Sequence, residues 1–236
     1  PEQAIKQGPN IKDWPKMAAL PKNLVLKVVS EIHDPVTTTD ELIPSGETSS
    51  YRSNPLGLAE FTLSRKDPEY VGEAKKVREA ELAREEARCQ GIALPEFRAI
   101  KHTLRDYFKF NDDEFGIGST IYAVKPGDGS AREQAASCQK VLGGWANIAK
   151  EYATKRYRSN LINWGMVPFI FPDEDIPFHK GDWIFVPDLA PQLAAGALEF
   201  TAYIVNPKDH ANDTECDEAA MAAAVRAASS HSVSFA

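Results

Sequence analysis

The 236-residue sequence contains only three cysteines, Cys89, Cys138 and Cys216, and they stand far apart. Without a C-x-x-C pair, the sequence indicates neither a disulfide framework nor a zinc site. An iron–sulfur cluster also needs a set of cysteines, so we expect this chain to hold no metal itself. Scarce, unpaired cysteines are typical of a reducing compartment, and we therefore predict a cytoplasmic protein.

Concentrated positive charge and long apolar runs are also absent. Lysine and arginine number 27 against 34 acidic residues, well mixed, for a net charge of −7. This balance argues against nucleic-acid binding, and we expect no membrane partner because no apolar run reaches membrane-spanning length. No signal peptide is visible, and the first residue is not methionine, so we expect a trimmed or excised product. The 43% of apolar residues supports a sizeable core.

No internal repeat is visible, and we predict a single domain over residues 1–236. Residues 1–21 are polar and rich in proline, which predicts an extended lead-in, and the branched run 24–32 predicts a strand. Residues 67–110 predict a charged helical insertion. Within it, residues 73–88 predict a solvated helix with only a thin apolar stripe of Ala74, Val77 and Leu82, and residues 95–110 predict a second helix. A partner-binding role for the charged helix stays open.

The second half of the chain alternates strand and helix patterns. Predicted strands at 119–124, 146–149 and 167–171 are separated by predicted helices at 133–142 and 153–164. Further strands are predicted at 183–186 and 199–205, and an alanine-rich helix at 217–228. This order is typical of a mixed, mostly parallel sheet flanked by helices, so we predict an α/β fold.

A glycine-rich turn joins the first of these strands to its helix. It reads Gly127-Asp-Gly-Ser-Ala-Arg132, and such a turn points backbone N–H groups and the positive end of a helix at an anion. Glycine at 127 and 129 permits positive φ and close approach to the backbone. Two interpretations compete: Ser130 caps the helix and Arg132 is solvated, or Ser130 is a reactive hydroxyl and Arg132 a carboxylate clamp. The Lys-Ser/Thr ending of a nucleotide-binding P-loop is missing.

Several linked motifs extend this turn. Gly127-Asp-Gly-Ser-Ala-Arg-Glu133 is followed by Leu142-Gly-Gly144, Ala149-Lys-Glu-Tyr-Ala153, Arg158-Ser-Asn-Leu161 and Gly165-Met-Val-Pro168. In order and spacing this series resembles the C-terminal, swivelling domain of the aconitase superfamily. The resemblance implies a swivelling β/β/α domain. It also implies a hydro-lyase that dehydrates and rehydrates a small di- or tricarboxylic hydroxy acid.

A polar loop upstream adds to the resemblance. Thr38-Thr39-Asp40 followed by Gly46 and Arg52 is similar to the family's T-T-D-H-I-S-x-x-G loop and its downstream arginine. Glu41 and Ile43 replace the histidine and serine of aconitases. In this respect the loop resembles that of the isopropylmalate dehydratase small subunit more than that of aconitases. From the residues alone, the threonines and Asp40 could instead bond to the local backbone, and Arg52 could be a surface charge.

The resemblance also assigns roles to individual residues. It implies that Ser130 is the base and that Asp40 supports the site. Arg52 and Arg132 would bind substrate carboxylates, with Gly129 and Ala131 also contacting the substrate. A [4Fe-4S] cluster is implied in a cluster-bearing large subunit or upstream domains, so that the chain alone would be inactive. The family usually has a second serine at the position of Ala131, and this departure leaves open a non-catalytic, carboxylate-binding or regulatory module.

Overall fold

The computed structural model describes residues 6–90, 104, 114–173, 175–205 and 231–235. Its elements in chain order are β1 (Asn23–Ile32), β2 (Thr37–Thr38), α1 (Thr39–Leu42), η1 (Ser49–Tyr51), α2 (Pro55–Ala59), α3 (Tyr70–Gln90), β3 (Phe115–Ala123), β4 (Pro126–Asp128), α5 (Arg132–Val141), β5 (Gly144–Ala149), α6 (Lys155–Asn163), β6 (Val167–Ile170), β7 (Trp183–Val186), α7 (Leu189–Ala194), β8 (Glu199–Val205) and β9 (His231–Phe235). The predicted alternation from β3 to β6 is confirmed. The predicted helices 95–110 and 217–228 lie outside the described residues, apart from the helical, buried Leu104.

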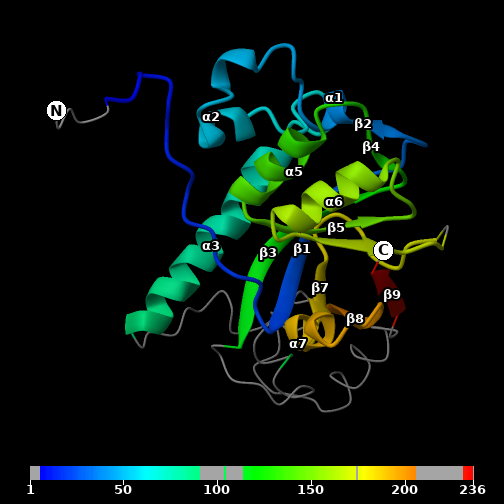
Figure 1. The fold of residues 1–236 in the computed structure, drawn as a ribbon. Helices are drawn as coiled ribbons and strands as arrows, with labels where there is room; N and C mark the ends of the chain where they lie inside the picture. Colours follow the sequence, from blue (N-terminus) through cyan, green and yellow to red (C-terminus); the bar gives the residue numbers. More distant parts are fainter. Residues whose placement is uncertain (1–5, 91–103, 105–113, 174, 206–230, 236) are drawn as a thin grey trace.

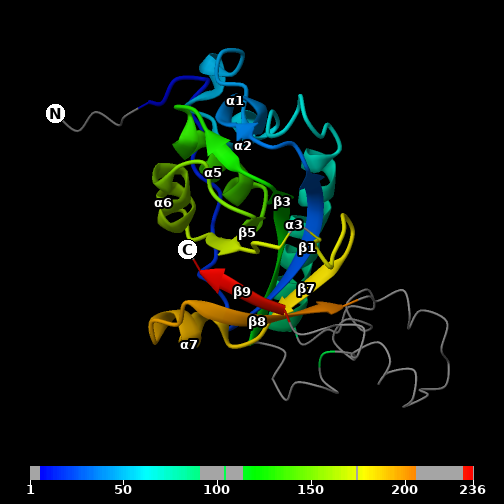
Figure 2. The ribbon, with the colours of Figure 1, turned by 90° about the vertical axis from the view of Figure 1, so that its right-hand side faces the viewer.

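Seven strands form a closed barrel in the order β1-β3-β5-β6-β9-β8-β7, and β7 returns to β1. The pairs β1–β3, β3–β5 and β5–β6 are parallel, as the strand–helix alternation predicts. Strands β7, β8 and β9 close the barrel through antiparallel pairs. The helices lie outside it (Figures 1 and 2), which confirms the predicted α/β fold with a mixed sheet flanked by helices.

Strand β1 shows how the two faces of the barrel wall are divided. Successive side chains of a strand point to opposite faces, and six of the ten residues of β1 are apolar. Leu24, Leu26 and Val28 pack in one cluster with the aromatic side chains of β6 and β8. Val25 and Val29 pack in the other cluster, with side chains from α3, α5 and α6. Apolar residues therefore point to both faces of this strand, because both faces are covered.

The helix α3 buries more of its residues than the predicted surface helix with a thin apolar stripe would. Ala74 and Val77 are buried as predicted, but Leu82 is 52% exposed, and the prediction for that residue is wrong. At about 100° per residue, position 82 lies roughly 140° around the helix from Val77, whereas positions 81 and 84 share its face. Glu81 and Arg84 occupy that face as an ion pair, with the Nε–Oε2 distance at 2.7 Å.

The N-terminal segment, residues 6–22, contains no helix or strand and is mostly exposed. The ring of Trp14 stacks on that of Trp164 at the end of α6, with 4.6 Å between the ring centroids. The described residues 6–22 thus follow an extended, exposed path, as predicted for the lead-in. The division into a single domain with an insertion over 67–110 stays a prediction.

Candidate functional site

Two loops that are distant in the sequence meet through a short parallel ladder. Strand β2 pairs with β4, with Thr37 opposite Pro126 and Thr38 opposite Asp128. The backbone N–H of Thr37 also donates to the carbonyl of Lys125, at 3.0 Å. Figure 1 shows β2, β4 and α1 together at the top of the molecule, beside the start of α5. The structure thus places the Thr-Thr-Asp loop against the glycine-rich turn.

Both glycines of the turn have the backbone conformation that the sequence predicts. Gly127 has φ of +95° and Gly129 has φ of +134°, which other residues rarely adopt. A Cβ at Gly129 would overlap the Thr39 hydroxyl, and one at Gly127 would overlap the ring of Tyr157. The close approach that glycine permits here is therefore made by two side chains of the protein itself.

The first turn of α5 has no side-chain cap. Its N-cap residue is Ala131, whose methyl group accepts no hydrogen bond, so the interpretation of Ser130 as the cap is wrong. Ser130 is exposed, and its hydroxyl makes no hydrogen bond among the described residues. The N–H groups of the first turn therefore lack a side-chain acceptor, and the positive end of the helix dipole adds to their attraction for an anion.

The two predicted carboxylate-binding arginines differ in burial. Arg132 is partly buried, and its Nε is buried without a hydrogen-bond partner in the described part of the chain. A buried guanidinium N–H without an acceptor is costly unless a ligand supplies one. Arg52 is exposed and directly follows η1, which contacts α2, and α2 in turn packs on α5. The turn and Arg52 are thus connected through packed elements.

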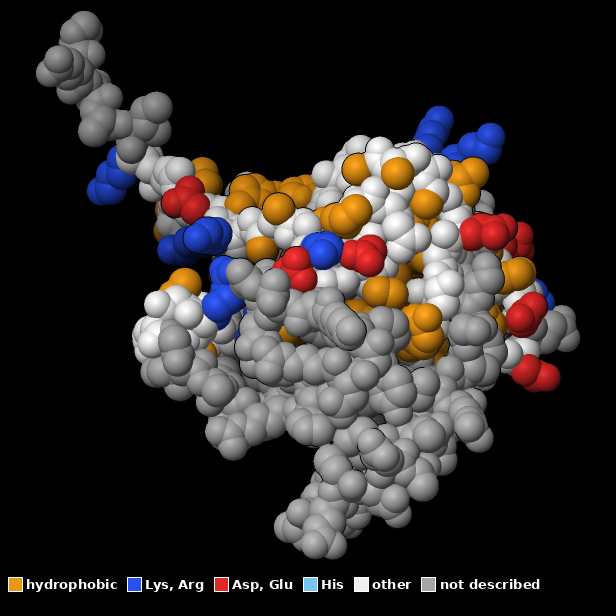
Figure 3. All heavy atoms as spheres, turned by 90° about the horizontal axis from the view of Figure 1, so that it is seen from below, with side chains coloured by type: hydrophobic (Ala, Val, Ile, Leu, Met, Phe, Trp, Pro, Cys, Tyr) orange, Lys and Arg blue, Asp and Glu red, His pale blue; other side chains and the backbone are white. Residues whose placement is uncertain are grey.

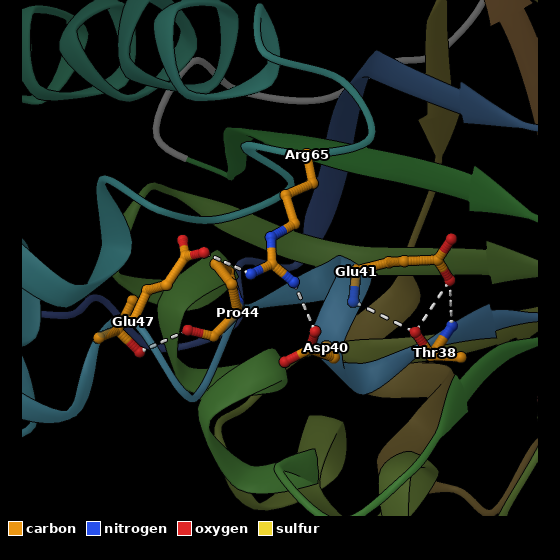
Figure 4. A network of polar contacts seen from close by, with 7 residues as sticks. Thr38, Asp40, Glu41, Pro44, Glu47 and Arg65 are labelled. Atoms are coloured by element: carbon orange, nitrogen blue, oxygen red, sulfur yellow. Dashed lines mark hydrogen bonds and ion pairs between the residues drawn. The ribbon is translucent and has the colours of Figure 1, made fainter.

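Asp40 is held by an arginine that the sequence analysis missed. The Arg65 guanidinium donates from Nη1 to Asp40 Oδ2 at 2.6 Å and from Nη2 to Glu47 Oε1 at 2.5 Å. Figure 4 shows Arg65 reaching between the two carboxylates. No pattern predicts these contacts, because Arg65 lies 25 residues from Asp40 and 18 from Glu47.

Glu41 and Ile43, the two departures from the aconitase loop, have local structural roles. Glu41 forms a capping box with Thr38, in which the Thr38 N–H donates to Glu41 Oε2 at 2.7 Å. Burial opposes ionisation of Glu41, but hydrogen bonds from Thr38 and Lys66 outweigh it and lower the pKa of the carboxyl group. Ile43 is fully buried. Figure 4 shows the Glu41 carboxylate turned toward Thr38 and away from Arg65.

A buried polar network supports the glycine-rich turn from beneath. The hydroxyl of Tyr157, whose ring lies under Gly127, accepts hydrogen bonds from Gln139 Nε2 at 2.9 Å and Asn147 Nδ2 at 2.8 Å. Burial raises the pKa of Tyr157, so the phenol stays protonated. The Thr154 hydroxyl caps α6 and donates to the Gly127 carbonyl at 3.3 Å. The turn is therefore anchored to both α5 and α6.

Metal ligands do not gather in the described residues, where no group of three or more His, Cys, Asp or Glu side chains could hold an ion. Cys89 is exposed on α3, while Cys138 is buried on α5, where burial raises its pKa to about 12. These residues do not fit the cysteine set that an iron–sulfur cluster requires. None of the helices in the described ranges has the length and apolar character needed to cross a membrane.

Comparison with known proteins finds relatives for the part of the chain that contains the glycine-rich turn. The family described as the aconitase C-terminal domain matches residues 110–174. The mitochondrial aconitate hydratase of Emericella nidulans is 30% identical over 137 residues, which are 58% of this chain and 15% of that protein. Aconitate hydratase A of Rickettsia bellii is 28% identical over 149 residues, 57% of this chain and 16% of that protein.

The chain thus spans about one sixth of the length of these curated relatives. Among solved structures, the 3-isopropylmalate dehydratase of Methanocaldococcus jannaschii overlays with a TM-score of 0.44 and 21% identity, covering 78% of this chain and 75% of that one. The matched segment contains β4, the glycine-rich turn, α5 and α6. Through this segment, the chain is similar to the aconitase C-terminal domain family.

Proposed function

We propose that this chain is the swivelling domain or small subunit of an iron–sulfur hydro-lyase that acts on a small di- or tricarboxylic hydroxy acid. The observation that carries the proposal is the β2–β4 ladder. It joins the Thr38–Asp40 loop to the turn over 127–132 at the uncapped start of α5. The family match supports a hydro-lyase of the aconitase type, and the substrate and residue roles are our proposals.

Ser130 is the proposed base. Elimination of water from a hydroxy acid requires removal of a weakly acidic C–H proton beside a carboxylate. A serine hydroxyl can take that proton only where its alkoxide is stabilised by N–H donors and a nearby cation. The exposed Ser130 precedes both the uncapped first turn of α5 and Arg132, and these groups would supply that stabilisation.

Arg132 and Arg52 are the proposed carboxylate ligands, because a guanidinium can grip a carboxylate with two parallel hydrogen bonds. The Arg132 Nε lacks an acceptor among the described residues, and a substrate carboxylate would provide one. Asp40 would support the site through its ion pair with Arg65. Gly129, whose Cβ side is occupied by the Thr39 hydroxyl, would contact the substrate through its backbone. Ala131 would leave room where a second hydroxyl is usual in the family.

The [4Fe-4S] cluster of such an enzyme would be bound by a cluster-bearing large subunit or by upstream domains of the same polypeptide. When bound there, it would supply the Lewis acid that assists departure of the substrate hydroxyl. The cysteines described here do not fit a cluster site, and we place none in this chain. A reducing, cytoplasmic compartment would suit both the cluster and these free cysteines.

The proposal is tested by reconstituting the chain with its cluster-bearing part and measuring dehydration of a panel of hydroxy acids. Ser130→Ala should lower kcat by roughly 10²- to 10⁴-fold, as expected for loss of a general base, without changing the circular dichroism spectrum. Ser159→Ala is the matched control, since this exposed serine on α6 donates only to the Lys155 carbonyl. A Ser130→Ala enzyme with full activity would end the assignment of the base.

The size of the native polypeptide separates the two possible architectures. An antibody against this chain would detect a protein several domains larger if the cluster lies upstream in the same polypeptide. A band near 26.0 kDa would indicate a separate small subunit. In that case, an iron-containing partner should co-purify with it.

A non-catalytic carboxylate-binding or regulatory module is the second candidate. Ala131 favours it, because the family's second serine is replaced by a methyl group at the helix start. Carboxylate binding by the reconstituted protein, without turnover of any hydroxy acid in the panel, would support this candidate over the enzyme.

A further inference from the structure

A second cleft lies near the opposite end of α5 from the glycine-rich turn. Its volume is about 70 Å³, and it is formed by the N-terminal segment, α3 and the α5–β5 turn. The charged residues in its lining are Lys16, Arg78, Lys140 and Glu81, and the others are apolar or glycine. We call it the Lys140 cleft.

Lys140 is a buried cation that forms no ion pair with a carboxylate among the described residues. Only 7% of the residue is exposed, although it lies in the last turn of α5. Its Nζ is 3.4 Å from the centroid of the Trp145 ring and 3.4 Å from the Gly165 carbonyl oxygen, and no carboxylate pairs with it among the described residues. A protonated amine has three donors, so at least one lacks a protein acceptor. Burial lowers the pKa of Lys140 to about 8.

The other two cations of the cleft are also without a carboxylate partner in the described part of the chain. Neither Lys16 nor Arg78 forms a hydrogen bond or an ion pair within the described ranges, and Arg78 is partly buried. Glu81 does not neutralise them, because its Oε2 accepts from Arg84 Nε at 2.7 Å and from the Ile117 N–H at 3.1 Å. In the view from below, Figure 3 shows Lys and Arg side chains near the N-terminal segment. The cleft thus has an excess of positive charge.

The C-terminal end of α5 opposes an anion, because a helix carries about half a negative charge there. This effect is reduced by the Leu142 N–H, which donates to the carbonyls of Cys138 and Gln139, and by the Gly143 N–H, which donates to that of Lys140. Three full positive charges outweigh the remaining partial charge. A cleft of about 70 Å³ is also far smaller than the roughly 300 Å³ or more of sites for cofactors and drug-sized ligands.

We propose that the Lys140 cleft binds a small oxyanion, either inorganic phosphate or a carboxylate of similar size, through Lys140, Arg78 and Lys16. The oxyanion supplies the acceptors that these donors lack, and it keeps Lys140 in its charged form. This site is distinct from the proposed carboxylate site, because Lys140 is eight residues along α5 from Arg132, about 12 Å at the helical rise.

Isothermal titration calorimetry of the full chain at pH 7 and low ionic strength tests the proposal, with inorganic phosphate and acetate as separate probes. Lys140→Met and Arg78→Gln should each weaken phosphate binding at least tenfold, since each removes a charge-assisted hydrogen bond. Lys155→Met, which removes an exposed lysine on α6, should leave that affinity unchanged. Tighter binding of phosphate identifies a phosphate site, and tighter binding of acetate identifies a carboxylate site.

Amide shifts in ¹H–¹⁵N spectra locate the bound ion without any substitution. Phosphate should shift Gly143 and Gly144 in the cleft, and an ion at the other end of α5 would shift Gly127 and Gly129 instead. Absence of phosphate binding, shifts confined to the second pair, or equal affinity in Lys140→Met and Arg78→Gln would overturn the proposal. If Lys140→Met fails to fold, the exposed Lys16→Gln and the partly exposed Arg78→Gln still decide the result.

Discussion

The hydroxyl of Tyr157 is the centre of the buried network beneath the glycine-rich turn, and Tyr157→Phe removes it while leaving the ring under Gly127. Gln139 and Asn147 both donate to this hydroxyl, and both side chains are at most 1% exposed. Phenylalanine offers no acceptor, and no water can easily reach donors so deeply buried. The substitution therefore leaves two buried donors unsatisfied.

The expected cost follows from that count. A buried donor without a partner costs about 1–3 kcal/mol. Gln139 Nε2 keeps its second hydrogen bond, to the Ala135 carbonyl at 2.8 Å. The free-energy cost at Gln139 therefore falls at the low end of this range. We therefore expect Tyr157→Phe to lower the free energy of unfolding by about 2–4 kcal/mol. For a chain of this length, the melting temperature should fall by roughly 5–15 °C.

Urea denaturation followed by circular dichroism measures the effect. Tyr51→Phe is the matched control, because Tyr51 is 39% exposed and its hydroxyl has no hydrogen bond among the described residues. Its free energy of unfolding should stay within about 0.5 kcal/mol of the wild type. A double-mutant cycle with Asn147→Ala should give a coupling of about 1 kcal/mol or more. If Tyr157→Phe is as stable as Tyr51→Phe, the hydrogen-bond argument is refuted.

Two further predictions concern the ends of α5. Gly129→Ala should lower the melting temperature by more than Gly181→Ala. Both glycines have positive φ, but only a Cβ at Gly129 would overlap Thr39. Equal losses would show that the overlap is relieved at no cost. Burial lowers the pKa of folded Lys140 to about 8, whereas in the unfolded chain its pKa is about 10.4. Between pH 8 and 10 the unfolded chain therefore binds more protons than the folded one. The free energy of unfolding of the wild type should rise over this range by up to about 1.4 kcal/mol per pH unit relative to Lys140→Met. A stability difference that does not change with pH would show that burial does not perturb this lysine.

Local patterns in the sequence predict most of the regular elements. The strands at 183–186 and 199–205 have the predicted bounds, because runs of branched and aromatic residues between turn signals leave little choice of conformation. Strand β3 begins at Phe115 instead of Ser119, since the glycines at 116 and 118 weaken the pattern. The elements β2, β4 and α1 were not predicted, because two to four residues show no periodicity.

The sequence by itself determines the order of strands and helices, the positive-φ glycines of the turn, and the family that the turn resembles. These features depend on a residue and its near neighbours, so spacing and residue type express them. Only the tertiary structure decides which loops meet. The pairing of Thr38 with Asp128, the hold of Arg65 on Asp40, and the burial of Lys140 beside Trp145 arise from sheet register and helix packing between distant segments. Local sequence carries no record of such contacts, because they depend on how the whole chain closes into the barrel.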